Sequence, residues 1–202
     1  DTILARITER EGTGPYHLQV TIMDAREVNA FALPGGRIVV LRGLLDLTDG
    51  PEMLAGLLAH EAQHVLRRHT TRAIIQHAST GLMVAAIAGD VSGLVAFALE
   101  GARVVAALGY SRRAEAEADA AGMRMLLGAH VDPAGLIRFF ERVARQHAAA
   151  EPHGVWRYLS THPVGDDRVE TLRALARRAP APPVPLLPDY DWKDIKRICS
   201  VA

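Results

Sequence analysis

The sequence contains the stretch Leu58-Ala59-His60-Glu61-Ala62-Gln63-His64-Val65, which has the pattern H-E-x-x-H. On a helix His60 and His64 are separated by about 400°, so both imidazoles project from one face. That spacing lets both rings reach one tetrahedral zinc ion at about 2.0–2.1 Å. Glu61 lies about 100° round the helix from His60, beside the metal rather than pointing at it. A base for a zinc-activated water is expected in that position, so the stretch predicts a helix that carries a hydrolytic zinc site.

Composition limits the class of protein. The chain has 202 residues, of which 49% are hydrophobic, so it can form one domain with a substantial core. Lys and Arg total 23, as do Asp and Glu, and this balance leads us to expect no nucleic-acid partner. The single cysteine, Cys199, cannot form an internal disulfide. A metal site must therefore be built from histidines and carboxylates.

The order of the remaining segments predicts a mainly helical α+β fold. Strand-like runs at 16–24, 27–33 and 37–45 should form a small antiparallel sheet beside the H-E-x-x-H helix. That helix should begin near Pro51 and continue to about His77, with His69 and His77 as solvated histidines rather than ligands. Further helices are expected at 111–127, 133–147 and 166–178. Residues 179–202, a proline-rich connector and a short helix, are expected to pack back on the main domain.

Residues 79–109 are rich in alanine and glycine, and their sequence is ambiguous. The apolar run 81–99 is about long enough to cross a bilayer. Asp90 and three glycines interrupt it, however, and a charge at mid-span is costly in lipid. We therefore expect two buried or partly exposed helices that meet near residue 89 rather than a membrane span. An apolar surface in 79–109 that docks on a membrane or an envelope protein is the alternative.

A second helix offers the third metal ligand. Glu115 and Asp119 are four residues apart on one face of the helix predicted at 111–127, and Glu117 points to the other side. Catalytic zinc needs three protein ligands and an open position, so Glu115 is the best candidate after the two histidines. Asp119 would accept a hydrogen bond from the outer ring nitrogen of a ligand imidazole, in our hypothesis that of His60. Such a bond fixes the orientation of the ring.

Four motifs occur in one order over about 140 residues: Asn29-Ala30-Phe31-Ala32-Leu33-Pro34-Gly35-Gly36, His60-Glu61-Ala62-Gln63-His64, Ser111-Arg112-Arg113-Ala114-Glu115-Ala116-Glu117-Ala118-Asp119, and Ser160-Thr161-His162-Pro163 followed by Arg168. In this combination the chain resembles the gluzincin peptidases of family M48. That family includes HtpX-like heat-shock proteases, CAAX prenyl proteases and mitochondrial inner-membrane quality-control proteases. The resemblance implies a zincin-like metallopeptidase domain over residues 1–178, with one zinc ion per chain.

The resemblance also assigns roles to individual residues. It implies Glu115 rather than Glu117 as the third ligand, and it brings the loop that holds His162 over the active site. We expect a zinc-dependent endopeptidase in which Glu61 is the general base. His162 would donate to the oxyanion; it could instead close the open zinc position and keep the enzyme latent, or simply cap its loop. Arg168 is expected to brace this loop through a salt bridge to an acid.

Substrate and location follow from the same interpretation. An extended peptide should pair with the edge of the sheet at Asn29, Ala30 and Phe31, so the expected substrate is a misfolded or envelope protein, or a peptide. The chain lacks clear transmembrane segments and looks more like the soluble, cell-envelope branch of the family, periplasmic or membrane-associated. It begins with Asp1 rather than Met, and we take it as a trimmed form whose targeting segment lies outside this sequence.

Two other classes of function stay open at this point. A chaperone or assembly factor could contain the zinc site and hydrolyse peptides only rarely. A zinc hydrolase of another kind would act on small esters or amides and not on unfolded proteins.

Overall fold

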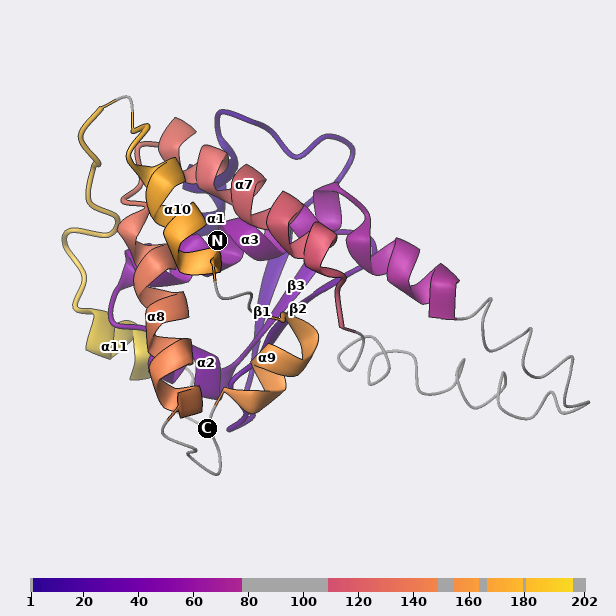
Figure 1. Ribbon diagram of the computed structural model, residues 1–202. Coiled ribbons are helices and arrows are strands. Elements are labelled where there is room, and N and C mark those ends of the chain that lie inside the picture. The colour runs from indigo at the N-terminus through magenta and orange to yellow at the C-terminus, as the bar shows by residue number, and fades with distance from the viewer. Residues whose placement is uncertain (1, 78–108, 149–154, 164–166, 180, 198–202) are drawn as a thin grey trace, which may run out of the picture.

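Helix α3 (Pro51–Leu66), which contains the H-E-x-x-H stretch, lies in the middle of the fold (Figure 1). The computed structural model describes residues 2–77, 109–148, 155–163, 167–179 and 181–197. Every residue of α3 from Met53 to Val65 is buried. The reason is that α1 (Thr2–Thr8), α7 (Arg112–Gly128), α8 (Ala134–Ala148) and the sheet all pack against it. The metal-site residues on α3 therefore face the core and not solvent.

The three strands form a mixed sheet in the order β1-β3-β2, where β1 is Gln19–Met23, β2 is Ala30–Leu33 and β3 is Arg37–Leu41. The predicted α+β, mainly helical fold is confirmed, but the sheet is not antiparallel throughout. β2 pairs antiparallel with β3, whereas β1 pairs parallel with β3. The chain reverses twice between β1 and β3, so these two strands run in the same direction. Because β3 lies between β1 and β2, it pairs parallel with β1 and antiparallel with β2. The turn at 34–36 has positive φ angles of 90° at Gly35 and 105° at Gly36, which only glycine adopts readily.

The helix predicted to continue to His77 is interrupted. α3 ends at Leu66, and residues 69–77 form a second helical segment. Between them Arg68 has a φ angle of 57°, a left-handed conformation that ends a helix. Its backbone nitrogen donates to the carbonyl oxygen of Val65 at 2.9 Å. The prediction of one continuous helix was wrong because no glycine or proline marks this break in the sequence.

Helix α7 brings the second group of site residues to α3. Its N-terminus is capped by Ser111, whose Oγ accepts a hydrogen bond from the backbone nitrogen of Ala114. Gly122 faces α3 closely, because a Cβ atom added there would lie 3.2 Å from the backbone nitrogen of His60. With a larger side chain at position 122, α7 would have to lie further from α3. The last element of the site, α9 (Trp156–Thr161), is followed by α10 (Arg168–Ala176).

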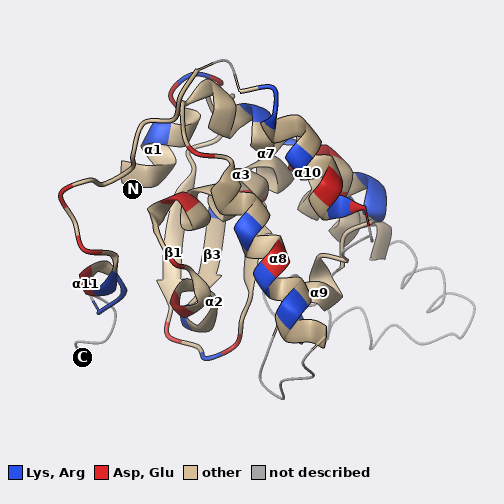
Figure 2. Cartoon of the chain, turned by 60° about the vertical axis from the view of Figure 1, so that its left-hand side comes forward, with Lys and Arg blue, Asp and Glu red and all other residues tan. Residues whose placement is uncertain are grey.

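The remaining short helices lie away from the site. α2 (Arg42–Leu47) follows β3, and α11 (Trp192–Arg197) begins with the buried Trp192. The indole nitrogen of Trp192 donates to Thr48 Oγ1 at 3.2 Å, just ahead of α3. Along α8 and α10 charged residues of both signs are interspersed (Figure 2). In the described part of the chain no helix is both long and apolar enough to span a bilayer. The hypothesis for residues 79–109 lies outside the described residues, apart from Gly109.

Candidate metal centre

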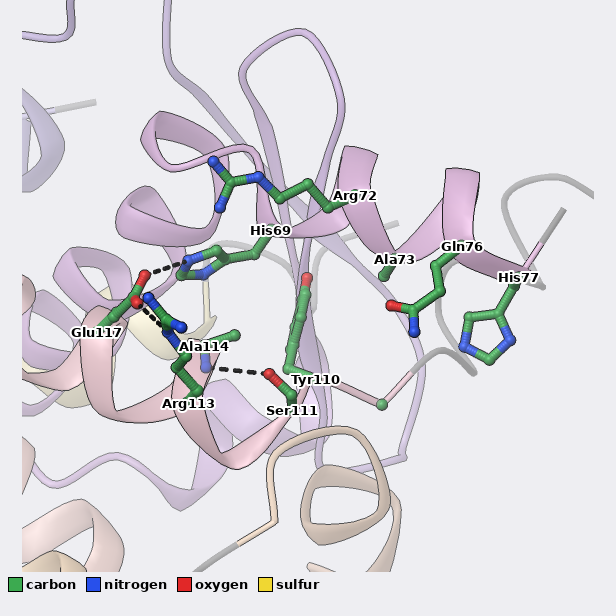
Figure 3. Close-up of a pocket in the computed structure, with 11 residues that line it drawn as sticks. His69, Arg72, Ala73, Gln76, His77, Tyr110, Ser111, Arg113, Ala114 and Glu117 are labelled. Carbon is green, nitrogen blue, oxygen red and sulfur yellow. Dashed lines mark hydrogen bonds and ion pairs between the residues drawn. The ribbon is translucent and has the colours of Figure 1, made fainter. Parts of the chain in front are cut away.

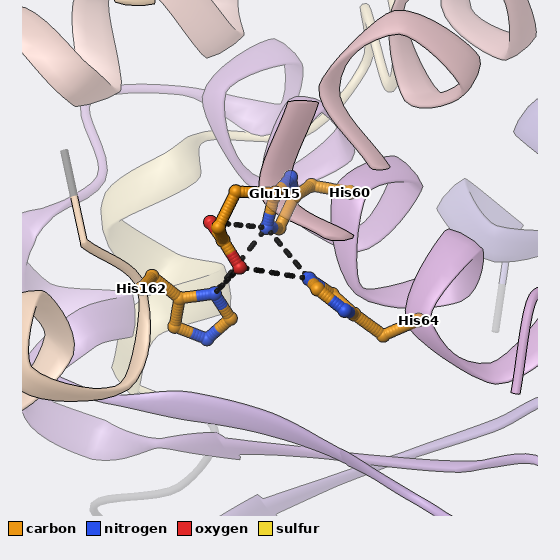
Figure 4. A group of neighbouring side chains, drawn as sticks. All are labelled: His60, His64, Glu115 and His162. Carbon is orange, nitrogen blue, oxygen red and sulfur yellow. Dashed lines mark hydrogen bonds and ion pairs between the residues drawn. The ribbon is translucent and has the colours of Figure 1, made fainter. Parts of the chain in front are cut away.

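Four side chains from three segments converge at one buried point (Figure 4). His60 and His64 come from α3, Glu115 from the first turn of α7, and His162 from the residue after α9. One ligand atom from each lies within 4.8 Å of every other. All four side chains are at most 4% exposed. The structure therefore brings together all three residues proposed as ligands from the sequence and adds His162 to them.

His60, His64 and Glu115 turn ring nitrogens and a carboxylate oxygen towards one another. His60 Nδ1 lies 2.9 Å from Asp119 Oδ1, so the ring turns its other nitrogen, Nε2, towards the donor group. That Nε2 is 3.1 Å from His64 Nε2 and 3.6 Å from Glu115 Oε2. Burial lowers the pKa of His64 well below its ordinary value, which favours the neutral form of this ring. Lone pairs and a carboxylate facing one another in a buried site repel unless a cation lies between them.

The distances between the donor atoms fit a zinc ion. Ligand atoms bound tetrahedrally at about 2.0–2.1 Å are roughly 3.3–3.4 Å from one another. Glu115 Oε1 is 3.4 Å from His64 Nε2 and 3.1 Å from His162 Nδ1. His162 Nδ1 is in turn 3.4 Å from His60 Nε2. Imidazole nitrogens with a carboxylate oxygen are an ordinary donor set for zinc, so the residues fit this ion.

Arg168 holds the two acids of α7 in place. Its Nε and Nη2 donate to the two carboxylate oxygens of Asp119, each at 2.7 Å. Its Nη1 lies 2.9 Å from Glu115 Oε2, so Oε1 is the oxygen turned towards His64 and His162. Burial opposes charge on Asp119, but His60 and Arg168 outweigh it and lower the pKa of that carboxyl. The expected salt bridge to an acid is present, and it reaches both acids rather than one.

Glu61 lies beside the donor group and not within it. It is fully buried, and neither carboxylate oxygen has a hydrogen-bond partner among the described residues. The nearest basic atom is His162 Nε2, 3.4 Å from Oε1. Burial is the main cause that raises the pKa of Glu61 above its ordinary value. A carboxylate with a raised pKa and oxygens that make no hydrogen bond is suited to accept and return a proton.

His162 is held by its surroundings with both ring nitrogens facing carboxylates. Its Nδ1 is 3.1 Å from Glu115 Oε1, and its Nε2 faces Glu61. Burial lowers the pKa of the ring, but Glu115 and Glu61 outweigh this and raise it. The ring of Tyr158 stacks on it at 4.5 Å between centroids. Ser160 and Thr161, predicted as loop, are instead the last residues of α9.

Three further residues of the site were missed or misassigned from the sequence. Tyr110 stacks on His64 at 3.8 Å, and its position directly before Ser111 could have pointed to it. Tyr158 precedes His162 by one helical turn, a spacing that predicts contact. His69 was predicted to be solvated, which is wrong: it is 5% exposed, and its Nδ1 lies 3.1 Å from His64 Nδ1. The break after α3 turns it inwards.

The predicted substrate edge is partly occupied by the protein itself. Asn29 is 1% exposed, and its Oδ1 accepts from the backbone nitrogen of Ala30 at 3.0 Å and from Thr161 Oγ1 at 3.4 Å. It thus links β2 to the residue before His162. Phe31 is partly exposed. Substrate binding along β2 stays a prediction.

Residues 2–176 match the family described as "Peptidase family M48". The chain belongs to peptidase family M48. The resemblance inferred from the four motifs is therefore confirmed, and with it the assignment to metalloprotease relatives.

The M48 relatives fall into two groups by name. Mitochondrial metalloendopeptidase OMA1 of Schizosaccharomyces pombe is 30% identical over 172 residues, which cover 84% of this chain and 50% of that protein. The beta-barrel assembly-enhancing proteases of Yersinia pestis and Escherichia coli K12 are each 29% identical, over 87% and 81% of this chain. Those alignments cover 37% and 35% of the two bacterial proteins. The chain thus spans between about a third and a half of the length of these relatives.

The bridge from Arg168 to the acids of α7 generates a prediction about stability. Arg168→Met should leave Glu115 and Asp119 buried without their cation, which costs about 3–5 kcal/mol of unfolding free energy. Urea unfolding of the zinc-free protein measures this. The control is Arg173→Met, because the Arg173 side chain is 49% exposed beside Glu141, and exposed pairs add little. Equal stability of Arg168→Met and wild type would contradict the account.

Proposed function

We propose that the chain is a zinc-dependent metalloendopeptidase. The observation that carries this proposal is the convergence of buried donor atoms from His60, His64 and Glu115 beside the unpaired carboxylate of Glu61. A zinc ion held by these residues would polarise the scissile carbonyl and lower the pKa of a water molecule to about 7. Asp119 would fix the ring of His60, and Arg168 would hold both acids.

Glu61 would move the proton in this reaction. One of its carboxylate oxygens takes a proton from the attacking water while the water oxygen bonds to the peptide carbonyl carbon. The same proton then passes to the leaving nitrogen as the carbon–nitrogen bond breaks. The buried position and raised pKa of Glu61 suit both transfers.

The substrate we propose is a protein or peptide in an extended conformation, misfolded or envelope proteins above all. Two features support this: membership in a peptidase family, and relatives named metalloendopeptidase and beta-barrel assembly-enhancing protease. The segment around Ala30 and Phe31 on β2 would take the peptide by strand addition. We propose a cell-envelope location, periplasmic or membrane-associated, by analogy with the assembly-enhancing relatives.

The role of Glu61 is tested by Glu61→Gln. The variant should retain zinc, because Glu61 is not among the donor atoms, while casein cleavage falls by about 10²–10⁴-fold. Metal analysis and single-turnover cleavage measure the two quantities, with the exposed Glu170→Gln as a control of normal activity. Undiminished cleavage by Glu61→Gln would remove Glu61 as the base. If the wild-type protein hydrolyses small esters but not casein, the alternative of a zinc hydrolase that acts on small molecules is favoured.

A latent form of the enzyme is the second function we consider, and His162 favours it. Its Nδ1 lies within the donor group, 3.4 Å from His60 Nε2. A fourth protein ligand closes the position that a catalytic zinc keeps open for water. In that arrangement the chain would serve mainly as an assembly factor and would cleave only when His162 moves away. Donation to the oxyanion requires the opposite, a ring that keeps its proton facing the substrate.

His162→Ala separates the two roles. If His162 closes the metal site, casein cleavage should rise several-fold because the position for water is open. A fall of about 10²–10³-fold would contradict latency and assign the oxyanion role. The double variant Glu61→Gln/His162→Ala is the control, because any activity gained through the same site should disappear in it.

A further inference from the structure

The outer nitrogen of His64 has a partner that is not a carboxylate. His64 Nδ1 lies 3.1 Å from His69 Nδ1, and His69 Nε2 lies 3.4 Å from Glu117 Oε2. Arg113 Nε donates to the other oxygen of Glu117 at 2.9 Å. Four side chains thus form a continuous line from the metal-site nitrogen of His64 to the surface.

The break after α3 makes this contact possible. In one continuous helix, residues five apart project about 140° from each other and do not meet. The left-handed conformation of Arg68 redirects the chain between His64 and His69. His69 is therefore buried against the ring of His64, with centroids 5.0 Å apart and planes at 70°. This edge-on arrangement suits a hydrogen bond between ring nitrogens.

The contact with Glu117 indicates which ring nitrogens of His69 and His64 carry protons. An ionised carboxylate only accepts, so Nε2 of His69 must carry a proton to bond with it. With its proton on Nε2, the ring of His69 presents Nδ1 as an acceptor to His64 Nδ1, which lies 3.1 Å away. His64 is left with its lone pair on Nε2, the nitrogen that faces the donor group.

We propose that His69 and Glu117 are positioning residues that fix the orientation and tautomer of His64 for metal binding. The two metal-site histidines are then oriented differently. His60 faces its carboxylate directly at 2.9 Å, whereas His64 reaches one through a second imidazole. This inference rests on the proposed zinc function.

We call the line of His64, His69, Glu117 and Arg113 the relay. Its outer three residues line a cavity of about 540 Å³, and Figure 3 shows dashed lines from Glu117 to His69 and to Arg113. The Glu117 side chain is 35% exposed and that of Arg113 is 89% exposed. Glu117 can therefore be replaced without opening a buried cavity. This makes the outer end of the relay a suitable place for a test.

The experiment measures zinc affinity by competition with a chromophoric chelator. His69→Phe keeps a ring of similar shape but cannot accept, and it should weaken zinc binding by about 10–100-fold. Glu117→Leu should weaken it by a smaller factor, and Glu117→Gln, which keeps an accepting oxygen, should restore most of the affinity. His77→Phe is the matched control, because His77 is exposed on the same helical segment.

Urea unfolding of the zinc-free proteins separates positioning from general stability. Weaker zinc binding by His69→Phe with an unchanged apo unfolding midpoint supports the proposal. If His69→Phe does not fold, the Glu117→Leu and Glu117→Gln pair decides. Wild-type affinity in His69→Phe, or in Glu117→Leu, would overturn the relay while leaving the zinc function intact. Wild type that binds no zinc would instead overturn the proposed function itself.

Discussion

The close approach of α7 to α3 is the constraint on which the whole site depends. Glu115 and Asp119 can meet the histidines of α3 only if the two helices nearly touch, and Gly122 permits this. A Cβ at Gly122 would be 3.2 Å from the backbone of His60 and of Ala59. A site assembled from two helices in this way is set by packing of the core, which is stiff. The packing of α3 against α7 thereby positions the donor atoms of His60, His64 and Glu115.

Burial of this site carries a cost that the protein offsets with specific partners. Charged and polar groups without partners are strongly unfavourable in a core. Arg168 neutralises Asp119 and Glu115, and its guanidinium also lies 3.8 Å from the centroid of the Phe140 ring. Among the described residues Glu61 makes no hydrogen bond, and its Oε1 faces Nε2 of His162 at 3.4 Å. The acids that hold the site are thus fixed, while the one proposed to move a proton is left free to accept it.

Much of the site could be predicted because it follows from helical spacing. His60 with His64, and Glu115 with Asp119, are pairs four residues apart, and this spacing alone puts each pair on one face. The mixed sheet was not predictable in this way, because strand order depends on which strand inserts between the others. The left-handed Arg68 has no marker in the sequence. His69 was therefore assigned to solvent, although it lies against His64.

The central claim is that Glu115, from a different helix, completes a zinc site with His60 and His64. Its most direct test is the zinc content of purified protein after dialysis against metal-free buffer, with Glu115→Ala and Glu117→Ala side by side. The account predicts one zinc per chain in wild type and loss of the metal from Glu115→Ala. Glu117→Ala should retain most of its zinc, because Glu117 positions the ring of His64 and does not itself bind the metal. Full retention of zinc by Glu115→Ala would contradict it.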